Sequence, residues 1–303
     1  MARPELRGLQ PQHEHFIGID SDGCVFPTME LKHRECFIPA TIRLWQLQPI
    51  CGYVREAAEF VNLYSRWRGE NRFPALLRVF DYLRERPEVV ESGVVVPELP
   101  ALREWIVHAP ALGNPALRRE IDNHPDPELI RTLKWSEAVN NSIAEMVVGV
   151  PPFPGVEAAL GRMVAAADIV VVSGTPARAL EREWREHDIA RYVRLIAGQE
   201  RGAKAEQLER AASGRYAAQK MLMIGDAPGD LSAAREVGAS FYPIIPGRER
   251  RSWKRLLEQD LDRFLAGGYA GKHENRLIEE FNHLLPDRPP WNRIRVKRIQ
   301  KGT

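Results

Sequence analysis

Two short apolar segments of this chain each run directly into a pair of aspartates, and this feature restricts the possible folds most. The segments are residues 16–19 and 221–224, and the aspartates that follow them are Asp20, Asp22, Asp226 and Asp230. A buried strand that delivers two carboxylates to one loop is costly unless a metal ion neutralises the charges or a reaction uses them. The other interpretation of the first pair is a structural turn, because Asp22-Gly23 favours turn dihedrals.

The chain after residue 150 alternates short strands with helices. β-Branched runs bounded by turn residues occur at 16–19, 169–172, 193–196, 221–224 and 241–245. Helical periodicity occurs between the later ones, at 155–167, 177–187, 204–212 and 231–237. Such alternation predicts an α/β fold with a Rossmann-like, doubly wound parallel sheet. Because ligands bind at the carboxyl edge of such a sheet, both aspartate pairs are expected to meet there.

The interval between the first two strands contains helical periodicity and almost nothing that resembles a strand. Apolar residues recur at helical spacing at Val54, Ala57, Ala58, Val61 and Tyr64, and again at Leu76, Val79, Phe80 and Leu83. This pattern predicts an all-α domain inserted into the sheet domain. We therefore expect a discontinuous core of residues 1–28 and 149–270, an inserted helical domain of residues 29–148, and a C-terminal helix with a basic tail over 271–303.

Two further polar positions suit a phosphate group. The second strand ends in Ser173-Gly174-Thr175, which supplies a hydroxyl, a flexible backbone and fresh amides at a helix start. The alternative for this segment is a helix N-cap that holds no ligand. Lys204 opens a later helix and would offset phosphate charge, although an exposed lysine is the default expectation.

The acidic residues favour magnesium over zinc or copper. Magnesium takes hard oxygen ligands in a tight octahedron and keeps several waters, so two or three carboxylates and a substrate phosphate suit it. Neither His nor Cys accompanies these aspartates at ligand spacing. The three cysteines, Cys24, Cys36 and Cys51, lack Cys-x-x-Cys spacing and indicate reduced thiols in a cytosolic protein.

Taken in chain order, these positions closely resemble the four motifs of the haloacid dehalogenase superfamily. The motifs correspond to Asp20-x-Asp22 after the first strand, Ser173 after the second, Lys204 ahead of the fourth, and Gly225-Asp226-x-x-x-Asp230 after it. The resemblance covers residues 16–26 and about 150–245; its first and fourth motifs are specific, and its third is assigned by position. The chain departs from the family at Cys24, where members usually carry threonine, and we interpret Cys24 as a small packing residue.

The resemblance implies a magnesium-dependent phosphohydrolase. Asp20 would attack phosphorus to form an aspartyl-phosphate, while Asp22 would protonate the leaving oxygen and then deprotonate the hydrolytic water. The implied phosphate-binding residues are Ser173, Gly174 and Lys204, and the implied magnesium ligands are Asp20, the Asp22 carbonyl, Asp226 and Asp230. An aspartate at position 22 favours phosphoryl over haloalkyl chemistry, because the dehalogenating members resemble this pattern without it.

The inserted segment occupies the position of the family's type-1 caps, which close over the site and select the substrate. Residues 64–73 concentrate guanidinium, amide and aromatic groups in one turn. We expect Arg68, Asn71 and Arg72 to meet the leaving group of the substrate, because guanidinium forks suit phosphate and polyol oxygens. The alternative is a solvated loop between two helices.

The expected function is hydrolysis of a small phosphorylated metabolite, such as a phosphoglycolate-, sugar-phosphate- or nucleotide-like compound, since a bulky cap excludes polymers. One alternative is a phosphomutase, in which the aspartyl-phosphate passes to another hydroxyl of the substrate. The other is a phosphate-binding or regulatory module that has the fold without turnover.

The overall charge gives no reason to expect a nucleic-acid or membrane partner. Lysine plus arginine (43) nearly balances aspartate plus glutamate (41), for a net charge of +2. No apolar stretch is long enough to span a bilayer, so a soluble, cytoplasmic protein is expected. The tail is either a solvated basic end or a contact for an anion such as RNA, through Arg293, Arg295, Lys297, Arg298 and Lys301. Nothing in the sequence indicates an oligomeric state.

Overall fold

The computed structural model describes residues 5–291 of the chain, which divide into two compact units. The first unit comprises residues 1–29 and 149–284, and the second comprises residues 30–148 and 285–303, as far as these are described. The first unit therefore extends beyond residue 270, the boundary expected from the sequence. The basic tail residues, from Arg293 onward, lie outside the described part of the chain.

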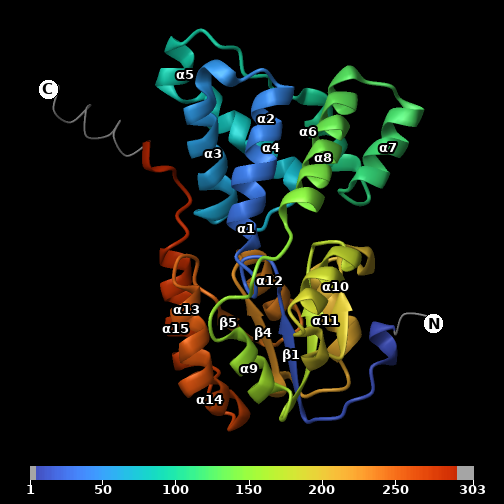
Figure 1. Ribbon diagram of the computed structural model, residues 1–303, viewed down its shortest axis with the longest axis vertical. Coiled ribbons are helices and arrows are strands. Elements are labelled where there is room, and N and C mark those ends of the chain that lie inside the picture. Colours follow the sequence, from blue (N-terminus) through green and yellow to red (C-terminus); the bar gives the residue numbers. More distant parts are fainter. Residues whose placement is uncertain (1–4, 292–303) are drawn as a thin grey trace, which may run out of the picture. The chain divides into compact units, whose positions relative to one another are not determined.

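The first unit is built on a five-stranded parallel sheet (Figure 1). Its strands are β1 (His15–Ile19), β2 (Ala167–Val172), β3 (Leu195–Ala197), β4 (Met221–Gly225) and β5 (Ser240–Pro243). They lie in the order β3-β2-β1-β4-β5, and β1 pairs with both β2 and β4. Because β1 and β4 are neighbours, the aspartates that follow them emerge at the same sheet edge. The expected α/β fold, with a parallel sheet and a helical insertion after the first strand, is confirmed.

Helices cover both faces of this sheet. They are α9 (Val156–Met163), α10 (Ala177–Glu186), α11 (Lys204–Ala212), α12 (Pro228–Glu236), α13 (Glu249–Arg255), α14 (Leu261–Leu265) and α15 (Lys272–His283), joined by short 3-10 and π segments. Ile17 and Ile19 of β1 face the core that α9 and α13 also line. A methyl group added to Gly18, between them, would lie 2.6 Å from the Leu208 side chain of α11. Glycine thus lets α11 approach β1 closely on the opposite face.

The second unit is helical. Its elements are α1 (Thr28–Leu31, at the unit boundary), the π-helical turn Lys32–Phe37, α2 (Ile38–Leu44), α3 (Cys51–Leu63), α4 (Arg72–Arg84), α5 (Pro87–Glu91), α6 (Pro100–His108), α7 (Asn114–Asn123) and α8 (Pro127–Met146). The apolar positions expected on α3 and α4 are buried, with one exception. Tyr64, the residue after α3, is 37% exposed and donates its hydroxyl to Glu30 at 3.0 Å. None of the helices in residues 5–291 is long and apolar enough to cross a membrane.

The segment that follows α15 belongs to the second unit, and we call residues 285–291 the C-terminal strap. The carbonyl of Pro286 accepts a hydrogen bond from the Arg66 amide at 3.2 Å. The Trp291 ring packs edge-on against Phe60, with 5.7 Å between the ring centroids. The chain therefore passes between the two units three times, after residues 29, 148 and 284.

A buried carboxylate at the amino edge of the sheet anchors the N-terminal segment. Asp168 is 1% exposed and accepts hydrogen bonds from the Gln12 amide (2.8 Å), the His13 amide (3.0 Å) and the Tyr216 hydroxyl (2.9 Å). It also pairs with the Arg194 guanidinium. Burial by itself raises the pKa of Asp168, but these donors outweigh burial and hold the pKa below its ordinary value. The ionised form is thus favoured in the folded protein.

We expect Asp168→Asn to lower the free energy of unfolding at pH 7 by about 2–3 kcal/mol, because it removes the charge that these donors hold. The folded pKa of Asp168 lies below the unfolded value of about 3.9. Its stabilising contribution is therefore present above about pH 4 and is lost as the pH falls through the folded pKa. Urea unfolding between pH 7 and pH 3 should show wild type and variant converging in acid. A constant gap between the two curves would contradict this account.

Candidate active site

The loop after β1 is a tight turn that holds both of its aspartates at the sheet edge. The Asp20 amide still donates to the Ile224 carbonyl of β4 at 2.9 Å, so Asp20 continues the ladder between the two strands. Gly23 has φ +79°, a left-handed conformation that favours glycine, and its amide donates to the Phe26 carbonyl at 2.8 Å. Asp22 thereby leaves the strand and enters a turn, while Asp20 stays at the strand end.

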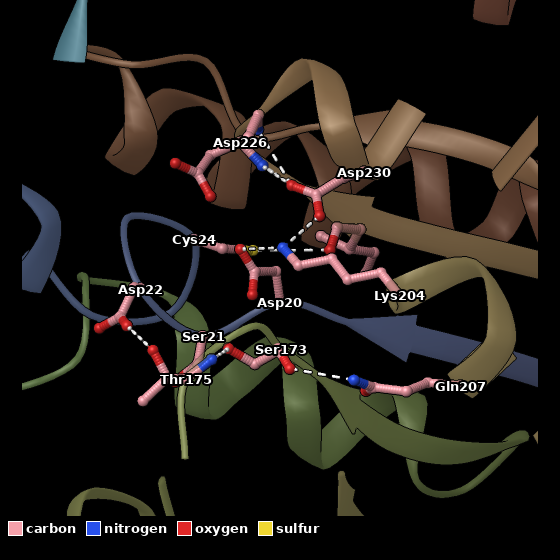
Figure 2. Close-up of polar contacts among 12 residues, drawn as sticks. Asp20, Ser21, Asp22, Cys24, Ser173, Thr175, Lys204, Gln207, Asp226 and Asp230 are labelled. Carbon is pink, nitrogen blue, oxygen red and sulfur yellow. Dashed lines mark hydrogen bonds and ion pairs between the residues drawn. The ribbon is translucent and has the colours of Figure 1, made fainter. Parts of the chain in front are cut away.

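Asp20, Asp226 and Asp230 form one buried acidic cluster (Figure 2). Each offers a carboxylate oxygen, and these oxygens all lie within 4.8 Å of one another. The second oxygen of Asp230 accepts the amides of Asp226 (3.1 Å) and Ala227 (3.0 Å), which caps the start of α12. Because of this cap, α12 begins at Pro228 and not at residue 231, as the periodicity had suggested. Asp20 is thus brought together with the sequence-distant pair Asp226 and Asp230 at one edge of the sheet.

Lys204, the first residue of α11, inserts its ammonium into this acidic cluster. Its Nζ lies 2.9 Å from Asp20 Oδ2 and 2.5 Å from Asp230 Oδ1. Burial opposes the charged ammonium, but Asp20 and Asp230 outweigh burial and raise the pKa of Lys204 above its ordinary value. For Asp20, burial raises the pKa well above its ordinary value; Lys204 counteracts this, and the charges of Asp230 and Asp226 add to it. Lys204, which the sequence resemblance assigned only by its order in the chain, therefore contacts Asp20 and Asp230 directly.

This donor set suits a divalent cation. When all three carboxylates are ionised, the single ammonium of Lys204 leaves two negative charges uncompensated in a buried place. Hard carboxylate oxygens within 4.8 Å of one another match the ligands that magnesium prefers. Asp20, Asp226 and Asp230 would hold such an ion through their side chains. The carboxylate of Asp22 is not part of this group, and the expected contact through its carbonyl stays a prediction.

Two threonine hydroxyls hold the carboxylate of Asp22. Thr175 donates to Asp22 Oδ2 at 2.6 Å, and Thr28 donates to Asp22 Oδ1. Neither threonine was predicted from the sequence to contact Asp22. The available signal was Thr175 itself, a second hydroxyl two residues after Ser173, whereas no spacing rule joins Thr28 to Asp22. Figure 2 shows the contact with Thr175, on the side of Asp22 away from the acidic cluster.

Ser173 and Gly174 lie at the carboxyl end of β2, at the same sheet edge as Asp20. The Ser173 amide donates to the Ala197 carbonyl of β3 at 3.1 Å, and its hydroxyl accepts the Thr175 amide at 3.2 Å. Gly174 is exposed, and a methyl group added there would meet nothing within 4 Å. The backbone here therefore remains open to a ligand.

Cys24 is fully buried beside the cluster, as expected of a small packing residue. Its thiol donates to the Ile224 carbonyl with a separation of 3.7 Å. Burial raises the pKa of the Cys24 thiol well above its ordinary value, and the neighbouring aspartates raise it further. A neutral, inert thiol is the consequence.

The three residues expected to meet the leaving group each have a structural contact within the second unit. Arg68 is 4% exposed and donates to the Leu63 carbonyl at 3.0 Å. Asn71 caps α4 by accepting the Phe73 amide at 3.0 Å. Arg72 donates to the side chains Ser136 Oγ and Asn140 Oδ1 of α8, at 2.9 and 2.8 Å. A contact between any of these three residues and a substrate stays a prediction.

No protein-family model and no curated protein matches this chain. Among solved structures, it is similar to a β-phosphoglucomutase from Clostridium difficile, with 13% identity, 83% of this chain and 97% of that chain covered, and a TM-score of 0.49. It is also similar to a haloacid dehalogenase-like family hydrolase from Streptococcus pneumoniae, with 14% identity, 79% and 90% coverage and a TM-score of 0.43. A third similar structure, described as a predicted phosphoglycolate phosphatase from Haemophilus somnus, has 12% identity, 76% and 84% coverage and a TM-score of 0.45. With identities this low and TM-scores below 0.5, the activity has to be inferred from the geometry of the site itself.

Proposed function

We propose that this chain, which has a haloacid dehalogenase-like hydrolase fold, is a magnesium-dependent phosphatase that acts on a small phosphorylated metabolite. This fold combines the sheet order β3-β2-β1-β4-β5 with a set of helices inserted after β1. The proposal rests above all on one observation: Asp20, Asp226 and Asp230 share a buried cluster with the ammonium of Lys204. Such an arrangement is costly for stability alone and is suited to a metal-assisted reaction.

The proposed reaction begins with Asp20 as nucleophile. A carboxylate oxygen of Asp20 forms a bond to phosphorus while the bond from phosphorus to the leaving oxygen breaks. Asp22 gives its proton to that leaving oxygen. It then takes a proton from the water that attacks the aspartyl-phosphate and releases inorganic phosphate, so the acid and base roles are exchanged.

Other groups at the edge support the charge that moves in this reaction. Lys204 counteracts the effect of burial on the pKa of Asp20 and lies where it can bind a phosphoryl oxygen. Ser173 and the Gly174 amide would bind further phosphoryl oxygens. A magnesium ion held by Asp20, Asp226 and Asp230 would supply positive charge that offsets the developing negative charge. Thr28 and Thr175 orient the carboxylate of Asp22.

Release of inorganic phosphate from a generic aryl phosphate, followed by a panel of sugar phosphates, nucleotides and phosphoglycolate, tests the proposal. We expect magnesium-dependent turnover that stops when EDTA removes the metal, since three buried carboxylates then repel the phosphate. Asp22→Asn, which conserves shape, should lower kcat by roughly a hundredfold or more as the acid/base group is lost. An isomerised substrate without net phosphate release would favour the mutase, and no turnover of any compound would favour the non-catalytic module.

A further inference from the structure

Gln207 is a fully buried polar side chain on α11, one helical turn after Lys204. Its amide nitrogen lies within hydrogen-bond distance of three backbone carbonyls: Ser173 (3.1 Å), Gly198 (3.2 Å) and Gly202 (2.9 Å). These carbonyls belong to the end of β2, the end of β3 and the loop before α11. One side chain therefore joins three backbone segments. Figure 2 shows its contact with Ser173, at the proposed phosphate site.

The bond to Ser173 fixes the orientation of one particular peptide plane. The carbonyl of Ser173 and the amide N–H of Gly174 belong to the same trans peptide and point in opposite directions. Because Gln207 holds the Ser173 carbonyl on the side of α11, the Gly174 N–H is directed away from α11. Gly174 itself is exposed. Within residues 5–291, this N–H donates to no protein acceptor. The donor is thus free for a ligand and has a fixed direction.

The contacts of Gln207 also show that its amide cannot be turned over. With nitrogen and oxygen exchanged, the amide oxygen would face three carbonyl oxygens at 2.9–3.2 Å, which is repulsive. In the observed orientation, Oε1 is buried and has no hydrogen-bond partner among the described residues. A buried amide with an unsatisfied oxygen is a costly way to fill a core position. Packing alone does not explain a glutamine at this position, whereas a role for its nitrogen in holding the three carbonyls does.

We propose that Gln207 is a positioning residue for oxyanion recognition: it orients the Gly174 amide and aligns the start of α11, and hence Lys204, toward one bound phosphoryl group. This inference rests on the proposed phosphatase function, because it assumes that the edge binds phosphate. Gln207 does not touch the phosphoryl group. It acts through two donors, a backbone N–H and an ammonium, whose directions determine how well they match the phosphoryl oxygens.

Binding of inorganic phosphate to the full-length protein in the presence of magnesium tests this proposal, with calorimetry as the readout. Gln207→Met retains the volume and removes the donor, and we expect the Kd for phosphate to rise roughly tenfold or more. Gln207→Glu is isosteric but presents oxygens to the three carbonyls, and it should weaken phosphate binding at least as much. The affinity for magnesium measured without phosphate should stay within about twofold, because Asp20, Asp226 and Asp230 are untouched.

Ala211→Gly is the matched control, since it weakens the same helix away from the site. It should lower the thermal unfolding temperature without raising the Kd for phosphate. If wild type binds phosphate and Gln207→Met binds it equally well, the inference is overturned while the phosphatase proposal stands. If Gln207→Met and Gln207→Glu each lose affinity for magnesium as well as for phosphate, Gln207 has only a packing role and the inference is again overturned. A wild type that binds no phosphate with magnesium would remove the phosphatase proposal, and this inference with it.

Discussion

Asp20→Asn is expected to abolish phosphatase activity and, at the same time, to stabilise the metal-free protein. The activity should fall at least about a thousandfold, because the amide cannot act as the nucleophile that attacks phosphorus. The stability should rise because burial and the neighbouring carboxylates raise the pKa of Asp20, so the folded protein disfavours its charge. Asparagine has the same shape without that charge. Thermal unfolding in EDTA and phosphate release in magnesium measure the two effects on the same preparation.

Asp262→Asn is a suitable control for this experiment. Its carboxylate is 59% exposed and pairs with Arg162 at the surface of the same unit, so neither activity nor unfolding temperature should change appreciably. Magnesium should also raise the unfolding temperature of wild type more than that of Asp20→Asn, since one of the proposed ligands has lost its charge. Retention of full activity by Asp20→Asn would refute Asp20 as nucleophile. If Asp20→Asn instead lowers the unfolding temperature in EDTA, the charge of Asp20 is stabilised in the folded protein more than its burial indicates.

Lys204→Met should have the largest effect on stability of any single change at the site. It removes the ammonium that contacts Asp20 and Asp230 and leaves both carboxylates buried without this partner. Breaking a buried ion pair in this way costs about 3–5 kcal/mol of unfolding free energy. Methionine fills most of the lysine volume, so the loss reports charge more than packing. Urea unfolding with and without magnesium is the measurement.

Magnesium should recover more stability in Lys204→Met than in wild type, because the variant has the larger uncompensated negative charge. Lys220→Met provides the comparison: this lysine pairs with Glu14, whose side chain is 78% exposed, and the loss should be below about 1 kcal/mol. Equal destabilisation by the two lysine substitutions would mean that the cluster around Lys204 is hydrated and does not need its charge.

The architecture of the first unit was predictable because each local signal agreed with the tertiary fold. The apolar runs before Asp20 and Asp226 became β1 and β4, and the helix expected from Lys204 to Ala212 has those bounds. The first and last residues of strands were harder to predict where a local turn uses the backbone groups that strand pairing would otherwise use. The strand expected at 193–196 begins only at Leu195, and the Val193 amide donates instead to Ala190 of the preceding 3-10 turn.

The candidate site was predictable to the extent that it depends on strand order. Parallel strands deliver their following residues to one edge, so Asp20 and Asp226 were expected to meet before any side chain was placed. Thr28, Thr175 and Gln207 were missed because their roles depend on side-chain directions and on contacts between distant segments. Gln207 left one trace in the sequence, a polar residue on the buried face of α11, but periodicity alone does not distinguish a structural amide from a positioning one.

The C-terminal strap affects whether the helical insertion can be excised or exchanged as an independent domain. A domain joined by two linkers can in principle be excised or exchanged by cutting both, and the ends of the host chain can then be rejoined. In this chain, a hybrid that replaced residues 30–148 would leave Trp291 without the Phe60 ring against which it packs. Conversely, a chain shortened to end at Leu284 would uncover that aromatic surface on the insertion. Any successful transplant must therefore carry residues 285–291 together with the helices.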